Sequence, residues 1–167
     1  MQPGDPEHIG PYRLITELGG GAAGRVFLAR SSDGQTVAVR VIRPDLAADP
    51  EFLARFRREV AAARKVDCRY AALVVDADVD GPVPWLATAY ISGPSLADRV
   101  RVEGPLPAAT AVKLAAGLAE GVAAVHAAGL VHHDLKPSNV LLEYDGPRVI
   151  DFGMSQAMEG SSPGLLR

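Results

Sequence analysis

The sequence His132-His133-Asp134-Leu135-Lys136-Pro137-Ser138-Asn139 places two imidazoles, a carboxylate, an ammonium group and an amide in one short loop. It follows a long Ala-rich segment and directly precedes the apolar run Val140-Leu141-Leu142. A loop this polar, held between two apolar elements, is a candidate binding or catalytic site. We therefore expect the rest of the chain to be arranged around this loop.

A second short motif, Asp151-Phe152-Gly153, follows the apolar run Arg148-Val149-Ile150. The two apolar runs can pair as a hairpin across the turn at residues 143–147, which would bring Asn139 and Asp151 to the same edge. Two oxygen ligands at that edge could hold a hard cation such as Mg²⁺ beside a phosphate. The sequence therefore predicts a metal and phosphate site between these two loops.

Composition limits the class of protein. With 167 residues, 48% hydrophobic and 22% charged, the chain has the make-up of one globular domain or two small lobes. The net charge of −3 gives no support for binding to nucleic acid, which needs a clustered basic face. The basic residues between Arg55 and Lys65 alternate with apolar residues at helical spacing, so they indicate a solvated helix face.

Two further features favour a protein of the cytoplasm. Cys68 is the only cysteine, which excludes an internal disulfide and fits a reducing compartment, and residues 1–10 lack the pattern of a signal peptide. The longest apolar region, residues 108–131, is interrupted by Lys113, Glu120 and His126. We interpret it as a buried helix of a soluble protein rather than a membrane span.

A glycine-rich segment, Gly19-Gly20-Gly21-Ala22-Ala23-Gly24, lies between two runs of strand-like alternation at residues 12–18 and 25–29. A dinucleotide fold or a P-loop would need a helix after the glycines, whereas here a strand follows. A turn at residues 32–34 and a third strand at 36–42 come next. The glycines therefore lie within a β-hairpin, either covering phosphates with their backbone N–H groups or forming a turn with no ligand.

The third strand predicts a cleft-facing cation. Side chains at steps of two share a face of a strand, so Ala38 and Arg40 point one way while Val37, Val39 and Val41 point the other. A small residue beside a cation suits a cleft for a flat base and its phosphates. An exposed strand position is the alternative for Arg40.

The segment Asp49-Pro50-Glu51 predicts the start of a helix, with Asp at the N-cap and Pro in the first turn. Apolar residues from Phe52 onward form one stripe, and Glu59 lies on or beside it. A carboxylate there needs a cationic partner, because burial without one is costly. Arg40 is one candidate, and a surface pair with Arg55 is the other.

The remaining pattern predicts two lobes. Strands at residues 73–79 and 85–91 would complete a five-stranded antiparallel sheet carrying one large helix, giving an α+β fold. After about residue 92 the pattern becomes helical, at 95–101 and at 108–128 with Gly129 as the stop. We therefore expect a loose lead-in at 1–10, an N-terminal lobe at 11–92 and a helical lobe at 93–167, with a ligand site at their junction.

In order, these motifs resemble the bacterial serine/threonine protein kinases related to the eukaryotic family. The resemblance runs from Tyr12 to Gly153. It rests on five matches: the glycine-rich loop with Gly19, Gly21, Gly24 and Val26; the strand Val37-Ala38-Val39-Arg40; the helix acid Glu59; the catalytic loop with Asp134 and Asn139; and Asp151-Phe152-Gly153.

The resemblance implies transfer of the γ-phosphoryl group of ATP to a Ser or Thr hydroxyl of a protein substrate. Asp134 would accept or orient the hydroxyl proton, Lys136 would offset charge on the γ-phosphate, and Arg40 with Glu59 would form the phosphate-binding pair. Asn139 and Asp151 would hold Mg²⁺. The ATP site would be completed by Leu18, Val26, Ala38 and Leu141 around the adenine, Thr88 at the back, and Ala89 to Ile91 as the hinge.

Three features depart from the family pattern. Arg40 stands where the family has Lys, and Arg is longer, planar and forked, so the exchange is not conservative. His133 stands where the family usually has an Arg that meets a phosphate on the activation segment. The sequence ends at Arg167, shortly after the Asp-Phe-Gly motif. We therefore expect a truncated kinase domain of impaired activity, with a catalytically inactive ATP-binding or regulatory module as the alternative.

Overall fold

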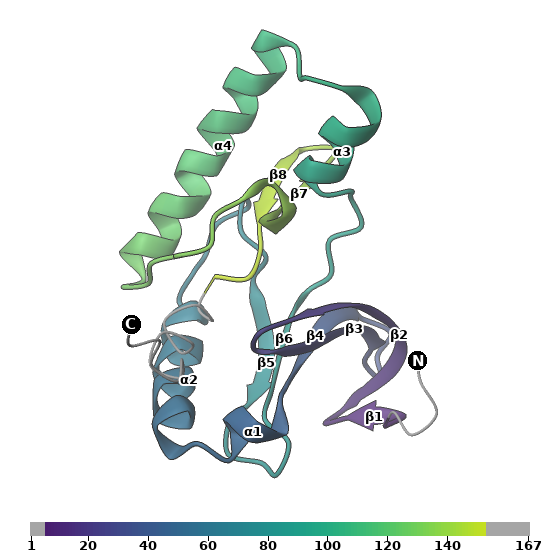
Figure 1. Ribbon diagram of the computed structural model, residues 1–167, viewed down its shortest axis with the longest axis vertical. Coiled ribbons are helices and arrows are strands. Elements are labelled where there is room, and N and C mark those ends of the chain that lie inside the picture. The colour runs from purple at the N-terminus through teal and green to yellow at the C-terminus, as the bar shows by residue number, and fades with distance from the viewer. Residues whose placement is uncertain (1–5, 153–167) are drawn as a thin grey trace, which may run out of the picture.

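The structure, a computed structural model, describes residues 6–152. Its first part is a six-stranded antiparallel sheet with the order β1-β2-β3-β4-β6-β5 (Figure 1). Strands β2, β3 and β4 pair in sequence order as antiparallel hairpins. Strand β6 then pairs with β4 on one side and with β5 on the other. The strands are β1 (His8–Ile9), β2 (Tyr12–Gly21), β3 (Gly24–Arg30), β4 (Thr36–Ile42), β5 (Val74–Asp78) and β6 (Trp85–Ala89).

The sheet buries a hydrophobic core on each of its two faces. On β4, Val37 and Val39 are fully buried in one core, while Ala38 and Arg40 face the other way, as the alternation predicts. On β6, Trp85 joins the same core as Val37, and Leu86 joins the core on the opposite side. The period of two along each strand is therefore what divides the apolar side chains between two layers.

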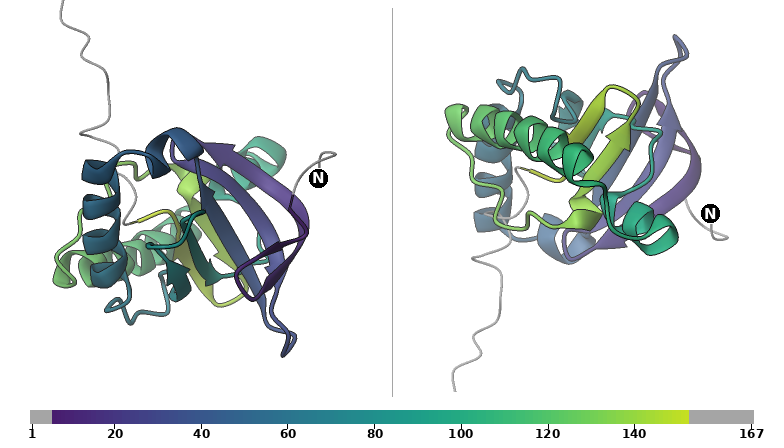
Figure 2. Two further views of the ribbon diagram at one scale, coloured as in Figure 1. Left: turned by 90° about the horizontal axis from the view of Figure 1, so that it is seen from below. Right: turned by 90° about the horizontal axis from the view of Figure 1, so that it is seen from above.

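The long helix of this part, α2 (Pro50–Ala63), covers one face of the sheet (Figure 2). Its N-cap is Asp49, whose side chain accepts a hydrogen bond from the backbone N–H of Glu51 at 2.9 Å. Phe52 and Phe56 are fully buried and stack with ring centroids 5.9 Å apart. The predicted helix start and apolar stripe are both confirmed.

The second part holds two helices and a hairpin. These elements are α3 (Leu96–Glu103), α4 (Ala108–Ala127), the 3-10 helix η1 (Pro137–Asn139), β7 (Val140–Glu143) and β8 (Gly146–Val149). The hairpin predicted around residues 143–147 is confirmed, and the right view of Figure 2 shows α4 crossing over it. Val149 also exchanges backbone hydrogen bonds with the segment after α2, donating to Tyr70 O at 2.8 Å and accepting from Ala72 N at 2.9 Å. This pairing ties the two parts together.

The sheet has one strand more than the five predicted. Strand β1 lies within the segment expected to be a loose lead-in, and it pairs through His8 with Arg13 and through Ile9 with Tyr12. Ile9 is buried in the sheet core, so one apolar side chain in a polar stretch is enough to add a short edge strand. A four-residue helix, α1 (Pro44–Ala47), was also not predicted.

The expectation that the Ala-rich helix α4 is buried is wrong. Gly117, Gly121 and Val125 are its buried residues, while Val112 is 69% exposed. The helix is long and apolar enough to cross a membrane by length and composition alone. Here its two glycines let it approach Tyr70 and Pro147 closely: a Cβ on Gly121 would lie 2.7 Å from Tyr70 O. Small side chains therefore determine the contact, and most of the helix surface remains open.

Candidate active site

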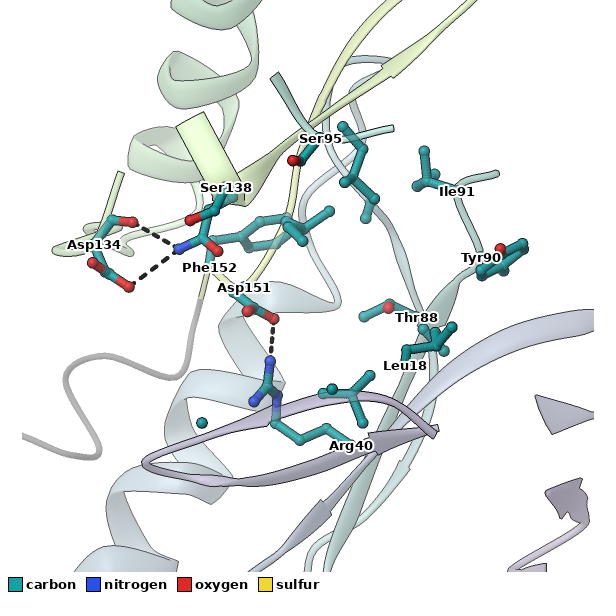
Figure 3. Close-up of a pocket in the computed structure, with 18 of the residues that line it drawn as sticks. Leu18, Arg40, Thr88, Tyr90, Ile91, Ser95, Asp134, Ser138, Asp151 and Phe152 are labelled. Carbon is teal, nitrogen blue, oxygen red and sulfur yellow. Dashed lines mark hydrogen bonds and ion pairs between the residues drawn. The ribbon is translucent and has the colours of Figure 1, made fainter. Parts of the chain in front are cut away.

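A cleft of about 930 Å³ lies between the two parts of the molecule. Its roof comes from the sheet, which is drawn in the lower half of Figure 3 with Leu18 and Arg40 labelled. The glycine loop, Val26 and Ala38 also line this side. Its floor comes from the loops around η1 and from β7, where Leu141 lines the cavity. Thr88 on β6 and the following residues 89–91 form the side where the chain passes between the two parts. The predicted junction site is therefore a real cavity.

The polar loop at residues 132–139 is held together by its own side chains. Asn139 donates through its amide nitrogen to the backbone oxygen of Asp134 at 2.8 Å and to its Oδ2 at 3.2 Å. The ammonium group of Lys136 lies 2.7 Å from the same Oδ2. These contacts hold the Asp134 carboxylate in one place at the mouth of the floor, although its side chain is 55% exposed.

The electrostatic setting keeps Asp134 charged. The hydrogen bond from Lys136 lowers the pKa of the Asp134 carboxyl below its usual value, and the hydrogen bond from Asn139 adds to this effect. Partial burial acts in the opposite direction but does not dominate. Asp134 is therefore an anion at neutral pH and can accept a proton or a hydrogen bond from a hydroxyl group.

Hydrogen bonds also fix the second loop to the first. The ring Nε2 of His132, a residue only 3% exposed, lies 2.8 Å from Ile150 O. Ile150 N donates to Asn139 O at 3.0 Å. Asp151 follows immediately, so the buried imidazole and the strand edge together determine where its carboxylate lies.

Two residues in these loops have backbone conformations that are uncommon for side chains other than glycine. They are His133, with φ of 57°, and Asp151, with φ of 62°. Asp and His tolerate this left-handed region better than most residues, and such strain clusters at functional sites. Both residues line the cleft. Their strain marks the same two loops that the sequence selects.

Arg40 reaches from β4 across the cleft and forms an ion pair with Asp151, as Figure 3 shows. The sequence favoured Glu59 or exposure to solvent for Arg40, so this partner is a correction. Glu59 is 5% exposed on α2, among the buried residues of that helix, and it does not line the cleft. A guanidinium group is longer and broader than an ammonium group, which lets Arg40 contact the carboxylate on the opposite wall.

The glycines divide into two roles. Gly19 and Gly21 line the cleft, as predicted, together with Gly20. Gly24 does not: its position is set by packing, since a Cβ there would lie 1.9 Å from Val41 O on the neighbouring strand. Below the loop, Arg25 holds Glu17 through two hydrogen bonds of 3.1 and 2.6 Å, which fixes the register of the hairpin that carries the glycines.

The other predicted site residues all line the cleft. They are Leu18, Val26, Ala38, Arg40, Thr88, Ala89, Ile91, Asp134, Lys136, Asn139, Leu141 and Asp151. At the predicted hinge, the N–H of Ala89 donates to Leu73 O at 2.9 Å, so the sheet uses this group. A base would therefore contact the remaining backbone groups of the hinge.

The prediction missed several lining residues, among them Tyr90, Ser95, Asp98, Ser138 and Phe152. Ser95 and Asp98 had a sequence signal, because Ser followed three residues later by an acid is a helix-capping pattern. Ser95 does cap α3, accepting from Asp98 N at 3.0 Å. That pattern indicates a helix start, and only the tertiary structure places it beside the cleft.

The donor atoms at the cleft fit a magnesium ion bound together with phosphates. In the described part of the chain, residues 6–152, no three His, Cys, Asp or Glu side chains are grouped so that they could hold a metal. Mg²⁺, however, commonly takes one or two protein oxygens plus substrate phosphates. The amide nitrogen of Asn139 donates its hydrogen bonds to Asp134. The amide oxygen of Asn139 and the carboxylate of Asp151 are therefore the groups that would contact the ion.

Comparisons with known proteins agree with this geometry. Residues 12–165 match the protein kinase domain family. Among curated proteins, the chain is 56% identical over 161 residues to the probable serine/threonine-protein kinase PkwA of Thermomonospora curvata, covering 96% of this chain and 22% of that protein. It is 53% identical over 157 residues to the serine/threonine-protein kinase AfsK of Streptomyces coelicolor, covering 94% of this chain and 20% of that protein.

Solved structures give the same result. The kinase domain of PknI from Mycobacterium tuberculosis superposes with a TM-score of 0.75 and 28% identity, covering 86% of this chain and 59% of that one. The chain thus spans about one fifth of the length of the two curated relatives named above. The family match covers most of the chain and includes every motif of the cleft. The chain therefore belongs to the protein kinase domain family.

Proposed function

We propose that this chain binds ATP in the cleft and carries the reacting groups of a serine/threonine protein kinase. One observation carries the proposal: Arg40, Asp134, Lys136, Asn139 and Asp151 come from three separate elements and converge on one cavity. The names of the relatives support the serine/threonine class. The proposed site of action is the cytoplasm, where ATP and protein substrates are available.

Asp134 performs the proton step in this proposal. Its carboxylate is charged at neutral pH and half-exposed, so a Ser or Thr hydroxyl of a substrate can approach it and donate its proton. Lys136, held 2.7 Å from that carboxylate, lies where it can also offset charge on the transferred phosphoryl group. Asn139 and Asp151 would hold Mg²⁺, which supplies charge neutralisation across the phosphates when bound.

The roof and hinge position the nucleotide. Leu18, Val26 and Ala38 above, and Leu141 below, form an apolar slot that fits a flat base. Gly19, Gly20 and Gly21 line the cleft beside this slot, and their backbone N–H groups would be the natural contacts for phosphates. Thr88 is a small side chain at the back, and it limits how deeply a base can enter.

A second candidate is a nucleotide-binding module without phosphoryl transfer. The ion pair between Arg40 and Asp151 favours it, because that pair engages the carboxylate expected to hold the metal ion. Arg in place of Lys also changes the geometry of phosphate contact. Binding would survive under this alternative, while the chemical step would not.

One pair of measurements separates the two candidates. Thermal unfolding is followed during titration with Mg-ATP, and transfer of labelled phosphate from ATP to a generic basic protein is measured in the same preparation. A rise in melting temperature together with transfer supports the kinase, because a ligand that binds the native state stabilises it.

Stabilisation without transfer would establish the nucleotide-binding module instead. The Asp134→Asn protein serves as the control for contaminating kinases, since it should bind ATP as the parent does and transfer phosphate at least about 10²-fold more slowly. Absence of any ATP-dependent stabilisation would contradict both candidates.

A further inference from the structure

The ion pair between Arg40 and Asp151 joins the two walls of the cleft across 111 residues of sequence. The Arg40 side chain is 12% exposed, so it is held inside the cavity rather than extended into solvent, whereas Asp151 is 39% exposed. Arg cannot be deprotonated in proteins, and therefore this cation is permanent. It lies beside a carboxylate that the proposed function assigns to the metal ion.

The other carboxylates of the cleft are compensated in the same way. Three Asp residues line it, and each has a cationic partner: Asp98 with Arg101, Asp134 with Lys136, and Asp151 with Arg40. Within residues 6–152, then, the cleft presents no carboxylate without a neighbouring cation. A divalent ion is drawn to a site by uncompensated negative charge, and it is repelled by a fixed cation at the same carboxylate.

The forked guanidinium group of Arg40 has enough N–H donors to contact a carboxylate and a phosphate at the same time. One nitrogen of Arg40 contacts Asp151. Because Arg40 lines the cavity, the remaining N–H donors of the guanidinium group could make a bidentate contact with phosphate oxygens bound there. A Lys at this position would offer a single point charge and could not contact carboxylate and phosphate as a planar fork.

We propose that the guanidinium fork of Arg40 supplies, from within the chain, part of the phosphate contact that a divalent ion otherwise provides. The cleft therefore binds ATP with little dependence on Mg²⁺. This inference rests on the proposed function, since it concerns how the same cleft takes its nucleotide.

Calorimetric titration of ATP into the whole chain tests the inference. Each protein is titrated twice, once with excess EDTA and once with saturating Mg²⁺, and the ratio of the two Kd values is the readout. For the parent chain the ratio is expected to stay below about threefold, and for Arg40→Lys to rise to about tenfold or more, a difference that such titrations resolve.

Arg57→Lys is the matched control, because Arg57 lies on the exposed side of α2 and pairs with Asp80, away from the cleft. Its ratio should equal that of the parent. A second variant, Asp151→Asn, keeps the size of the side chain and releases the guanidinium group toward the phosphates. It should raise the affinity for metal-free ATP about threefold or more.

The outcomes are distinct. A parent ratio of about tenfold or more that Arg40→Lys leaves unchanged overturns the role of Arg40, while ATP binding itself stands. Weaker metal-free binding by Asp151→Asn overturns it as well. No binding by any of the proteins in either buffer overturns the proposed function, and this inference falls with it.

Discussion

The roof and the floor of the cleft are built by different means. The roof is a sheet whose two faces are closed by buried side chains, with Val39 in one core and Phe56 of α2 in the other. The floor consists of loops held by hydrogen bonds among Asp134, Lys136 and Asn139, and the helix before them, α4, is largely exposed. The roof therefore depends on hydrophobic burial, while the floor depends on a few polar contacts.

This difference predicts that single changes in the floor remove chemistry and leave the fold, whereas changes behind the roof remove the fold. Asp134→Asn should give the largest effect. Loss of a positioned general base lowers the rate of transfer by about 10²–10⁴-fold. The half-exposed position of Asp134 should leave the melting temperature within a degree or two of the parent, about the effect of a surface change. Rates on a generic basic protein and thermal unfolding provide the two readouts.

Phe56→Ala should act in the opposite way. Phe56 is fully buried between α2 and the sheet, so its truncation leaves a cavity and lowers the free energy of unfolding by about 3–5 kcal/mol. Urea unfolding measures this change. Val112→Ala on α4 is the matched control, since Val112 is 69% exposed and the change should stay within about 0.5 kcal/mol. Equal losses for the two variants would contradict the contrast between the helices.

Gly121→Ala tests the closest of the contacts that the two glycines of α4 make. The added Cβ would lie 2.7 Å from the backbone oxygen of Tyr70. Overpacking of this kind costs about 1–3 kcal/mol, and the better helix propensity of Ala returns up to about 1 kcal/mol, so a net loss of about 1 kcal/mol is expected. Ala123→Ser, at an exposed position two residues further, should change the urea midpoint little. A stabilised Gly121→Ala protein would show that α4 can move away from Tyr70.

Lys136→Ala should lower the transfer rate and, as a smaller and more specific effect, shift the acidic side of the pH profile. The Lys136 hydrogen bond is the largest cause of the lowered pKa of Asp134. Without it the pKa of Asp134 returns upward toward its usual range, so the carboxylate becomes protonated at a higher pH and transfer declines earlier on acidification.

The profile above about pH 6 should keep its shape even if the maximal rate falls, because Asp134 is ionised there in both proteins. An acidic limb that does not move would show that another group controls it. Lys65→Ala, at an exposed position outside the cleft, removes the same charge and therefore controls for general loss of charge.

The sequence was sufficient to place most of the cleft, because its motifs are local. The spacing of Asn139 and Asp151 around a hairpin predicts their approach, and the alternation of β4 predicts that Ala38 and Arg40 share a face. Ser95 and Phe152 were missed because nothing in their local pattern distinguishes a cleft wall from an ordinary cap or core residue.

What the sequence by itself determined is the set of elements and the identity of the polar groups, since hydrophobic period, helix caps and glycine turns act over a few residues. Only the tertiary structure decided which charges meet: Arg40 contacts Asp151 rather than Glu59, and Gly24 packs on Val41 rather than lining the cleft. It also decided that the apolar helix α4 is exposed. Contacts between distant segments depend on the relative positions of whole elements, and no local pattern encodes those positions.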